Sequence, residues 1–446
     1  MSKTLIVGHG GREGAILTRL MRSGPVYAVV AHENPTIMDG VQASGGAILI
    51  ANPTDTTQIA AFATHHHIDL AIVSADEPLA AGVVDGLLAA NIPTVGPTRA
   101  GARIEWDKEY ALHLMSMLCP EVTPIFRVVR DVRDIAPAMA MFRDRGIEIV
   151  VKPQGLTGGK GVKVMGPHLR NWDEACRYTE ALLTSRPHES VLWVEKLLGV
   201  EFTIMFLTDG THVVPAPATY DYSYRYDGDS GPGTGSMGAF SDVFPHLPFM
   251  TASHSAQALA IAQRVILAIR ETGDHYSGVL NAGFFITPQG LRFLEFNARF
   301  GDPEGINIMT ILESDAPALF RSLANGSLNS SAVRFASQAS VVKYLVAPEY
   351  ATETPALAQD FTLDESALAA QGIQTYFASA IRTAPHRYRT AGSSRCVALA
   401  TAAETLDIAY ARIEAGIAAH VQGPLQWRKD VGDPCYVAQL NNVCAF

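Results

Sequence analysis

A polar stretch near residue 300 carries the residue types best suited to binding phosphates and metal ions. Glu295, Asn297 and Arg299 occur at every second position. Because successive side chains of a strand point to opposite faces, we expect these three on one face. Carboxylate and amide oxygens suit a magnesium ion that shares a substrate's phosphates, and a guanidinium suits a phosphate or carboxylate. An edge strand with a polar outer face is the competing interpretation. The residues expected to face a core are Leu294, Phe296 and Ala298.

Lysines and glycines earlier in the chain supply positive charge and backbone freedom. Residues 149–153 predict a strand that ends at Lys152, and residues 155–163 (Gly-Leu-Thr-Gly-Gly-Lys-Gly-Val-Lys) follow it. Glycine lets a backbone close over a ligand and lysine brings the charge, so we expect a hairpin lid over phosphates. No Gly-Lys-Ser/Thr opens a helix, which excludes a Walker loop. An ordinary hairpin is the alternative. Lys108, in a helix predicted over 105–118, by itself indicates only a solvated lysine.

Residues 191–204 predict two strands joined by a short apolar linker. The linker's backbone could face a nucleotide's base, and Glu201 could accept hydrogen bonds from the ribose hydroxyls. Two core strands joined by a turn explain the same pattern equally well.

The N-terminus combines a strand, a glycine-rich loop and a helix. Thr4–Val7 is a buried-strand pattern, residues 8–13 read Gly-His-Gly-Gly-Arg-Glu, and a helical pattern follows. Backbone amides at such a helix start favour an anion. The glycine spacing is not the full dinucleotide fingerprint, so a nicotinamide site is weakly supported. A tight turn without a ligand is an equal alternative.

A second glycine-rich segment spans residues 220–238 and begins Tyr220-Asp221-Tyr222. It is too long for a hairpin turn, which indicates either a functional or a disordered loop. Its tyrosines and aspartates argue against a simple flexible linker.

The amino-acid composition indicates a globular protein with several domains. The 446 residues include 48% apolar and 17% charged residues, enough for two to four domains with substantial cores. A net charge of -10 argues against general nucleic-acid binding. No apolar run approaches the length of a membrane span, and the start does not resemble a signal peptide. Five scattered cysteines without a CxxC pair suggest reduced thiols in a cytoplasmic protein.

These motifs, in this order, resemble the ATP-grasp superfamily and, within it, the phosphoribosylamine-glycine ligase family of purine biosynthesis. The resemblance extends from residue 8 to residue 432. The matching segments are residues 10–13, 96–98, 158–161, 227–232, 237–238, 295–304 and 428–430.

The resemblance implies an α/β and α+β multidomain fold. We expect an N-terminal parallel-sheet preATP-grasp domain over 1–100 and an ATP-grasp domain over 101–328. Within the latter, a mobile lid would occupy about 122–195, and a small C-terminal α+β domain would follow over 329–446. In the first hundred residues, strands are predicted at 4–7, 26–30, 70–73 and 94–95 with helical or loop segments between them, which independently favours a parallel sheet. A further helical pattern runs from Met309 to Leu323.

The same resemblance implies a reaction in which ATP, glycine and 5-phosphoribosylamine give glycinamide ribonucleotide, ADP and phosphate through glycyl phosphate. The metal would be Mg²⁺ or Mn²⁺, held by Glu295 and Asn297. The residues implied to take part in catalysis are Arg299, Lys152 and Asp221. Those implied to bind the nucleotide are Lys108, Lys152, Gly158, Gly159, Lys160, Gly161, Glu195, Lys196, Leu198 and Glu201. Those implied to bind the other substrates are Gly10, Gly11, Arg12, Glu13, Asp221, Gly235, Ser236, Met237, Gly238 and Arg299.

Several positions depart from the family pattern. Gly14 stands where the family often has histidine, Ser236 where it has glycine, and Gly283 where some members place a glutamine ligand. Residues 393–394 are serines in place of a glycine pair before Arg395. The changes at Gly14 and Ser236 lie on the amine-substrate side, so another ATP-grasp ligase with a different amine acceptor remains an alternative, as does a non-catalytic nucleotide binder. Expected partners are small molecules, with no nucleic acid and no membrane, in a monomer or small homo-oligomer.

Overall fold

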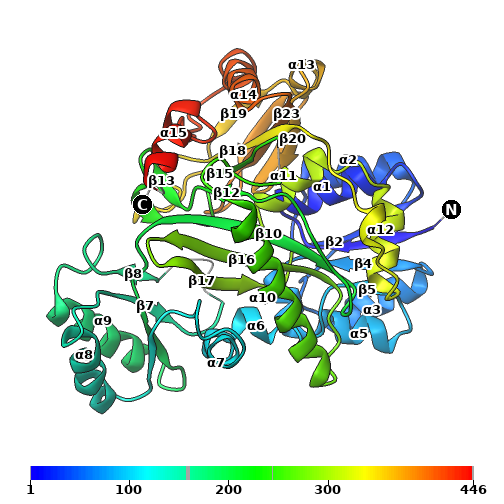
Figure 1. Cartoon of the computed structure of the whole chain (residues 1–446). Coiled ribbons are helices and arrows are strands. Elements are labelled where there is room, and N and C mark those ends of the chain that lie inside the picture. The colour runs from blue at the N-terminus through cyan, green and yellow to red at the C-terminus, as the bar shows by residue number, and fades with distance from the viewer. Residues whose placement is uncertain (1, 157–160, 244, 444–446) are drawn as a thin grey trace.

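The N-terminal region of the computed structural model is a five-stranded parallel sheet in the order β3-β2-β1-β4-β5 (Figure 1). The structure describes residues 2–156, 161–243 and 245–443. Strands β1, β2 and β4 are buried throughout, as expected of apolar runs covered by helices on both faces. The elements are β1 Thr4–Val7, α1 Gly11–Leu20, β2 Val26–Val30, α2 Pro35–Ser44, β3 Ile48–Ile50, α3 Thr56–His65, β4 Leu70–Val73, α4 Asp76–Ala81, α5 Val83–Ala89 and β5 Thr94–Val95.

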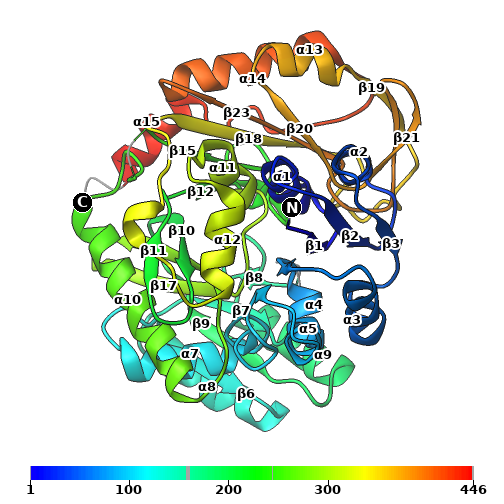
Figure 2. The same cartoon turned by 90° about the vertical axis from the view of Figure 1, so that its right-hand side faces the viewer.

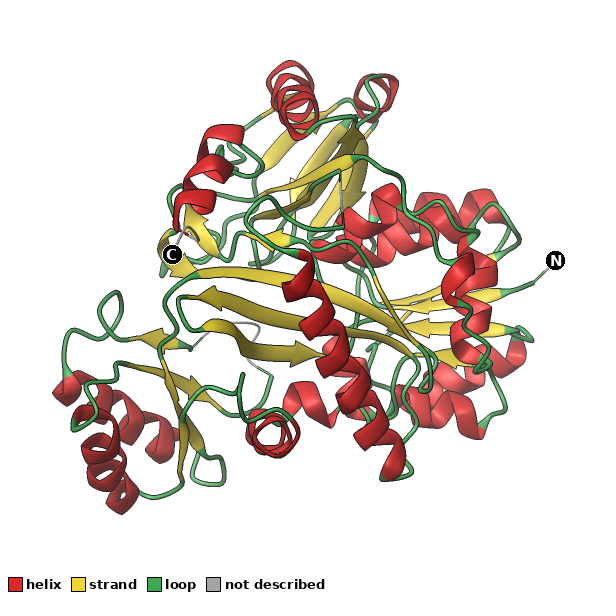
Figure 3. Ribbon diagram, viewed as in Figure 1, coloured by secondary structure: helices red, strands yellow, loops and turns green. Residues whose placement is uncertain are grey.

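A four-stranded antiparallel sheet in the order β11-β10-β16-β17 forms the middle of the molecule. The long helix α10 packs across one face of it (Figures 1 and 3). The other face contributes Met205, Leu207 and Val279 to a hydrophobic cluster that also contains Ile6 and Val342, so it meets the N-terminal and C-terminal regions. The elements are α6 Arg103–Trp106, α7 Lys108–Leu118, β10 Val200–Thr208, β11 Val213–Pro215, α10 Ala252–Glu271, β16 Gly278–Thr287, β17 Gly290–Asn297, α11 Glu304–Ile311 and α12 Ala316–Ala324.

A smaller unit with its own sheet, β6-β9-β7-β8, extends from this body at the lower left of Figure 1. One hydrophobic cluster consists entirely of buried residues between 129 and 193 and includes Phe142 and Trp193. This unit is therefore packed as a separate core. The elements are β6 Phe126–Val129, α8 Ile135–Arg143, β7 Ile149–Pro153, β8 Lys163–Val164, α9 Trp172–Ser185 and β9 Val191–Glu195.

The C-terminal region contains two antiparallel sheets, β12-β15-β18-β23-β20 and β21-β22-β19-β24. Helices α13 and α14 lie over the first sheet at the top of Figure 2, and α1 and α11 contact it from the other side. The elements are β12 Tyr220–Asp221, β15 Gly238–Ser241, β18 Ala339–Leu345, β19 Asp360–Leu363, α13 Glu365–Ala370, β20 Gln374–Phe377, β21 Ala380–Ala384, β22 Arg387–Thr390, β23 Val397–Ala403, α14 Leu406–His420, β24 Val421–Gln422 and α15 Pro434–Val443.

Strands β12 and β15 come from residues 220–241, yet β15 pairs with the C-terminal strand β18, and β12 pairs with β15 at the edge of the same sheet. The chain segment that carries Asp221 thus belongs to the C-terminal sheet in space, although it lies more than ninety residues before Ala339 in sequence.

The glycine-rich segment after β12 is ordered, which corrects the expectation of a loop too long to be a hairpin. It forms a hairpin of β13 Tyr224–Tyr226 and β14 Ser230–Gly233. Arg428 holds this hairpin, because its NH1 donates to the carbonyl of Tyr224 at 3.1 Å and to Asp229 at 2.8 Å.

Two predicted helices are each divided in two. The helix expected over 105–118 is interrupted at Asp107, whose carboxylate accepts from the Tyr110 amide at 3.0 Å and begins α7. The helix expected from Met309 to Leu323 is α11 followed by α12, and Asp315 caps the second. In both cases a capping aspartate competes with the continuous helical pattern.

The multidomain α/β and α+β fold is confirmed. Across the described parts of the chain, every helix is too short or too polar to cross a membrane.

Candidate active site

The face of the central sheet opposite α10 carries the polar residues predicted to do chemistry. Directly paired residues on antiparallel strands share a face. Gly283 pairs with Thr203 of β10 on one side and with Glu295 of β17 on the other. Asn281 pairs with Asn297. Glu295 and Asn297 therefore lie on one face with each other, as their spacing predicted.

A β-bulge between Gly283 and Phe284 changes the expected pattern beside Glu295. Phe284 pairs with Phe293, and Leu294 is left without a direct partner. Phe293 is buried, whereas Leu294 is partly exposed. The expectation that Leu294 faces the core is therefore wrong, because the bulge inserts one residue and brings Phe293 to the core face.

Glu105, a carboxylate that no sequence pattern had indicated, holds Arg299 beside Asn297. The NH2 of Arg299 donates to Asn297 Oδ1 at 3.1 Å, and its Nε lies 3.2 Å from Glu105 Oε1. Glu105 also accepts from the Ala298 amide at 2.7 Å. Burial raises the pKa of Glu105, although Arg299 opposes the shift. Glu105 therefore orients the guanidinium toward the site face.

Lys108 and Lys152 approach the same region from α7 and β7. Lys152 is buried. Lys108 Nζ donates to the carbonyl of Gly155. Burial lowers the pKa of Lys108, Glu295 opposes this, and Lys152 adds to it, which indicates that the three charges are close. Of the predicted lid, Gly161 lies at the start of the described part and accepts from Tyr178 Oη at 2.7 Å, while Gly158, Gly159 and Lys160 lie outside the described residues.

Glu195 and Lys196, at the start of the linker, form hydrogen bonds within the protein. Glu195 Oε2 accepts from the Ile125 amide at 2.9 Å and from Arg292 at 2.8 Å. Lys196 Nζ donates to Glu148 at 2.6 Å. Leu198, by contrast, is 67% exposed. What the linker offers a ligand is therefore the apolar surface of Leu198, since the amides of Glu195 and Lys196 also donate to carbonyls of the protein.

Glu201 lies on the site face at the start of β10. Burial and the nearby charge of Glu295 raise the pKa of Glu201 to about 8, and Lys152 acts in the opposite direction. Glu201 is thus protonated below about pH 8 when no ligand is bound.

The N-terminal loop is locked by its own side chains. Glu13 accepts from the Gly10 amide at 2.8 Å, from Arg12 Nε at 2.7 Å and from Ser74 Oγ at 2.7 Å. Arg12 NH1 donates to the carbonyl of Phe300 at 2.8 Å. A Cβ at Gly11 would lie 2.6 Å from Tyr344 Oη, so only glycine fits there. The loop is thereby fixed to the turn that follows β17.

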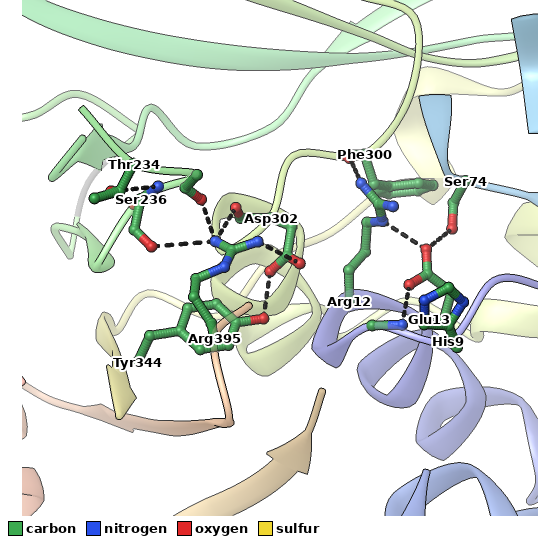
Figure 4. Close-up of polar contacts among 12 residues, drawn as sticks. His9, Arg12, Glu13, Ser74, Thr234, Ser236, Phe300, Asp302, Tyr344 and Arg395 are labelled. Atoms are coloured by element: carbon green, nitrogen blue, oxygen red, sulfur yellow. Dashed lines mark hydrogen bonds and ion pairs between the residues drawn. The ribbon is translucent and has the colours of Figure 1, made fainter. Parts of the chain in front are cut away.

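Arg395 holds that turn from its other end (Figure 4). It donates to the carbonyl of Asp302 at 2.8 Å and to the Asp302 carboxylate at 3.0 Å. It also donates to the carbonyls of Gly235 and Ser236. Tyr344 donates to Asp302 at 2.6 Å and lies beneath the guanidinium. The C-terminal region thus joins the site through Arg395 and Tyr344.

The 235–238 loop places its predicted residues differently. Met237 is fully buried in a hydrophobic cluster. Ser236 has a φ of 77°, in the left-handed region that favours glycine, and its hydroxyl bonds to the backbone of Gly238. Burial and Glu304 raise the pKa of Asp221 well above its usual value, and the Ser236 hydroxyl opposes this. Asp221 of β12 and Ser236 of the loop thus place polar side chains next to each other near Glu304 of α11.

A cavity of about 580 Å³ lies between α7 and the smaller unit, lined by residues such as Asp107, Gln154 and Glu189. It adjoins Lys108 and Gly155 along the chain, but Glu201, Glu295 and Asn297 do not line it. The polar sheet face, not this cavity, unites the candidate catalytic groups.

The donor set on the sheet face suits a hard divalent cation that is shared with a substrate. Within the described ranges, no three His, Cys, Asp or Glu side chains form a metal-binding group. Glu295 is exposed, and Asn297 offers an amide oxygen two residues along the same strand. Magnesium typically takes one or two protein oxygens and completes its shell with waters and phosphates. The residues present fit this mode.

Two parts of the chain match models of known protein families. Residues 2–105 match a family model described as phosphoribosylglycinamide synthetase, N domain, and residues 107–305 match its ATP-grasp (A) domain. The chain belongs to the phosphoribosylglycinamide synthetase family.

A curated relative agrees with membership of this family, and solved structures share the fold. A phosphoribosylamine–glycine ligase of Methanothermobacter thermautotrophicus is 38% identical over 432 residues, covering 96% of each chain. A structure of phosphoribosylamine–glycine ligase from Thermotoga maritima has a TM-score of 0.76 at 22% identity, covering 96% of this chain and 99% of that one. The biotin carboxylase domain of a Hydrogenobacter thermophilus 2-oxoglutarate carboxylase, solved with magnesium ADP, shares the fold at a TM-score of 0.70 and 16% identity, over 100% and 94% of the two chains.

Residues that only the three-dimensional structure brings to the site are Glu105, Asn281, Tyr344 and Arg395. Of these, Arg395 could have been found from the sequence, because it follows residues 393–394, which are serines where the family pattern has a glycine pair.

Proposed function

We propose that this chain joins glycine to 5-phosphoribosylamine with ATP, giving glycinamide ribonucleotide, ADP and phosphate, a step of de novo purine biosynthesis. The observation that carries the proposal is the polar sheet face, where Glu295 and Asn297 lie beside Glu201 in a chain of the phosphoribosylglycinamide synthetase family. The proteins that support it are relatives named for this reaction at 38% identity over nearly the whole chain.

ATP lies between the central sheet and the smaller unit. Lys108 and Lys152 pair with its phosphates, because Lys108 lies near both Glu295 and Lys152, and Lys152 lies near Glu201. Glu201 accepts hydrogen bonds from the ribose, and the linker with Leu198 borders the base. The lid residues Gly158, Gly159, Lys160 and Gly161 close over the phosphates.

A divalent cation, Mg²⁺ or Mn²⁺, would be held by Glu295 and Asn297. When bound, it neutralises developing charge on the phosphates. Arg299 is the protein's own contribution to the same task, because Glu105 and Asn297 fix its guanidinium at this face.

In the first step, a carboxylate oxygen of glycine attacks the γ-phosphorus, and the bond from that phosphorus to the bridging oxygen of ADP breaks. Arg299 and Lys152 neutralise the charge that moves onto the transferred group. The product, glycyl phosphate, is an acyl phosphate that water would hydrolyse, so exclusion of water by the lid protects it.

In the second step, the amine of phosphoribosylamine attacks the glycyl carbonyl carbon, a C–N bond forms, and phosphate leaves with one oxygen from glycine. The amine loses a proton, and Asp221 accepts it. Burial and Glu304 raise the pKa of Asp221, which makes it a stronger base than an exposed aspartate. Gly10, Gly11 and the 235–238 loop border the phosphoribosyl group.

A related ligase with another amine acceptor is the second candidate, and a specific observation favours it. The side chain of Ser236, which stands in place of the family's glycine, lies next to Asp221 on the side where the amine would arrive. The site for the carboxylate and ATP is the same in both candidates.

The cellular setting that we propose is the cytoplasm, with small-molecule substrates, no nucleic acid and a monomer or small homo-oligomer. The net charge of -10 and the free cysteines at Cys119, Cys176, Cys396 and Cys435 support this setting.

Release of phosphate from ATP, with each substrate omitted in turn, tests the proposal. We expect sustained turnover only with both glycine and phosphoribosylamine generated in the reaction mixture. Turnover with glycine and a different amine would favour the second candidate. ATP binding without turnover under any of these conditions would overturn both.

A further inference from the structure

Asn281 is a fully buried amide in the middle of an apolar strand. Its side chain is 1% exposed, and its neighbours along β16 are Leu280 and Ala282, both buried. The register with Asn297 places it on the site face of the sheet rather than on the α10 face. A polar side chain so deeply buried is normally satisfied by hydrogen bonds.

Only half of this amide is satisfied. Asn281 Nδ2 donates to Glu304 Oε1 at 3.3 Å. Oδ1 is buried and accepts no hydrogen bond from any described residue. Because the carboxylate of Glu304 is paired as an acceptor, this contact fixes which end of the amide is nitrogen. The free atom is therefore an oxygen, which requires an N–H or O–H donor.

The position of Asn281 marks the inner end of the site. On one side it pairs with Asn297, and side chains of directly paired residues are about 5 Å apart. On the other side its strand neighbour is Met205, which belongs to the hydrophobic cluster that includes Val279 and Met309. Oδ1 thus lies between the groups that bind the reacting carboxylate and a closed apolar wall.

We propose that Asn281 Oδ1 accepts a hydrogen bond from the α-ammonium group of glycine, with Glu304 as the counter-charge. This inference rests on the proposed function. Glycine's carboxylate reacts beside Asn297 and Arg299, and one carbon separates that carboxylate from the ammonium. An ammonium group needs oxygen acceptors and negative charge, and the hydrogen-bonded pair of Asn281 and Glu304 supplies both.

The pair would make Asn281 a residue that determines specificity for an amino acid over a simple carboxylic acid. A ligand without the ammonium group leaves Oδ1 unsatisfied and Glu304 without a counter-charge. A site built around a buried polar group rejects an analogue that lacks the partner. Acetate, which is glycine without its ammonium, is therefore the diagnostic probe.

The test uses isothermal titration of glycine and of acetate into the full-length protein with magnesium and a non-hydrolysable ATP analogue. The variant is Asn281→Leu, which keeps the shape of the side chain and removes both polar atoms. We expect glycine affinity to fall about 10- to 100-fold, the effect of losing one hydrogen bond to a charged group. Acetate affinity and binding of the ATP analogue should stay within about threefold of wild type.

A purely structural role for Asn281 predicts a different outcome. Loss of packing or of the Glu304 contact would weaken the binding of glycine and of acetate to the same extent, and that result would overturn the inference. Unchanged glycine affinity in Asn281→Leu would overturn it as well, as would a loss confined to the KM for phosphoribosylamine.

A second variant keeps the test informative if Asn281→Leu does not fold. Asn281→Asp retains an oxygen acceptor at the same place, and its second oxygen, when protonated, can donate to Glu304 as Nδ2 does, so we expect it to keep the wild-type preference for glycine over acetate. Loss of that preference in a folded Asn281→Asp protein would contradict the inference. Failure of the proposed function is distinguishable, because wild type would then show no turnover that depends on glycine.

Discussion

Glu295 lies directly opposite Gly283 in the antiparallel ladder of β16 and β17. A Cβ at Gly283 would stand 3.7 Å from Glu295 Cγ, within ordinary contact distance. With glycine there, the carboxylate has no side chain beside it on the neighbouring strand and stays open to a ligand.

We predict that Glu295→Gln abolishes turnover and leaves the fold intact. The substitution removes the charge that would hold the divalent cation, and metal-assisted charge stabilisation is worth several kcal/mol. We therefore expect kcat to fall about 100-fold or more. Because Glu295 is exposed, the melting temperature should not change. Steady-state phosphate release measures the first effect and differential scanning calorimetry the second. Glu353→Gln, at another exposed glutamate, serves as the control, and near-normal rates for Glu295→Gln would refute the metal assignment.

Arg395→Met should weaken binding of the amine substrate and leave binding of the nucleotide unchanged. The side chain connects Asp302 to the carbonyls of Gly235 and Ser236, all on the amine side of the site. Loss of charge-assisted hydrogen bonds predicts a KM for phosphoribosylamine about 10- to 100-fold higher. Arg395→Lys should not restore it, because lysine cannot donate through a planar fork.

A matched control for Arg395 is Arg389→Met, since that arginine pairs with Asp360 on the surface. It should behave as wild type. An equal rise in the KM for ATP in Arg395→Met would show that the arginine supports the whole site rather than the amine side.

The affinity for ATP should depend on pH through Glu201. Burial and Glu295 raise the pKa of Glu201 to about 8, so the ligand-free protein carries a neutral carboxyl at pH 7. The ionised form is the stronger acceptor for ribose hydroxyls, so ATP should bind more tightly as pH rises through about 8. Titrations of a non-hydrolysable analogue between pH 6.5 and 9 measure this. Glu201→Gln should abolish the dependence, and an unchanged pH profile in that variant would assign it to another group.

Asp209 should stabilise the fold in a pH-dependent manner. Its carboxylate accepts from the amides of Thr211, His212 and Leu328 at 2.7 to 2.9 Å. Burial acts to raise its pKa, but these bonds and the His212 ring outweigh burial and lower it. A lowered folded pKa means that the contribution is present above the unfolded value of about 3.9 and is lost as pH falls through the lower folded value.

Asp209→Asn should therefore lower the free energy of unfolding by about 1 to 3 kcal/mol at pH 7, because one buried acceptor position becomes a donor. The difference from wild type should shrink below about pH 4. Urea unfolding at pH 7 and pH 3 measures both values. Asp144→Asn, at an exposed aspartate, should show neither effect, and an equal cost of Asp209→Asn at both pH values would contradict the linkage.

Buried runs of Val, Ile and Leu allowed four strands of the N-terminal sheet to be predicted at the observed bounds, Thr4–Val7, Val26–Val30, Leu70–Val73 and Thr94–Val95. The edge strand Ile48–Ile50 was not predicted, because it is short and only partly buried. Local pattern is sufficient where both faces of a strand are covered.

The position of Leu294 could not be predicted from its own strand. It depends on a bulge, and a bulge is a property of two paired strands. The same reasoning applies to the site's supporting residues. Glu105 meets Ala298 across 193 residues of sequence, and Arg395 meets Asp302 across 93. Alternation of Glu295, Asn297 and Arg299 was visible locally, whereas the side chains that orient them were not.

Transfer of oxygen from glycine to phosphate tests the central claim most directly. With glycine labelled by ¹⁸O in its carboxylate, the proposed reaction predicts that each phosphate released carries one labelled oxygen, and only when phosphoribosylamine is present. Mass spectrometry of the phosphate measures this. Turnover that releases unlabelled phosphate would contradict activation of glycine's carboxylate at the face formed by Glu295, Asn297 and Arg299.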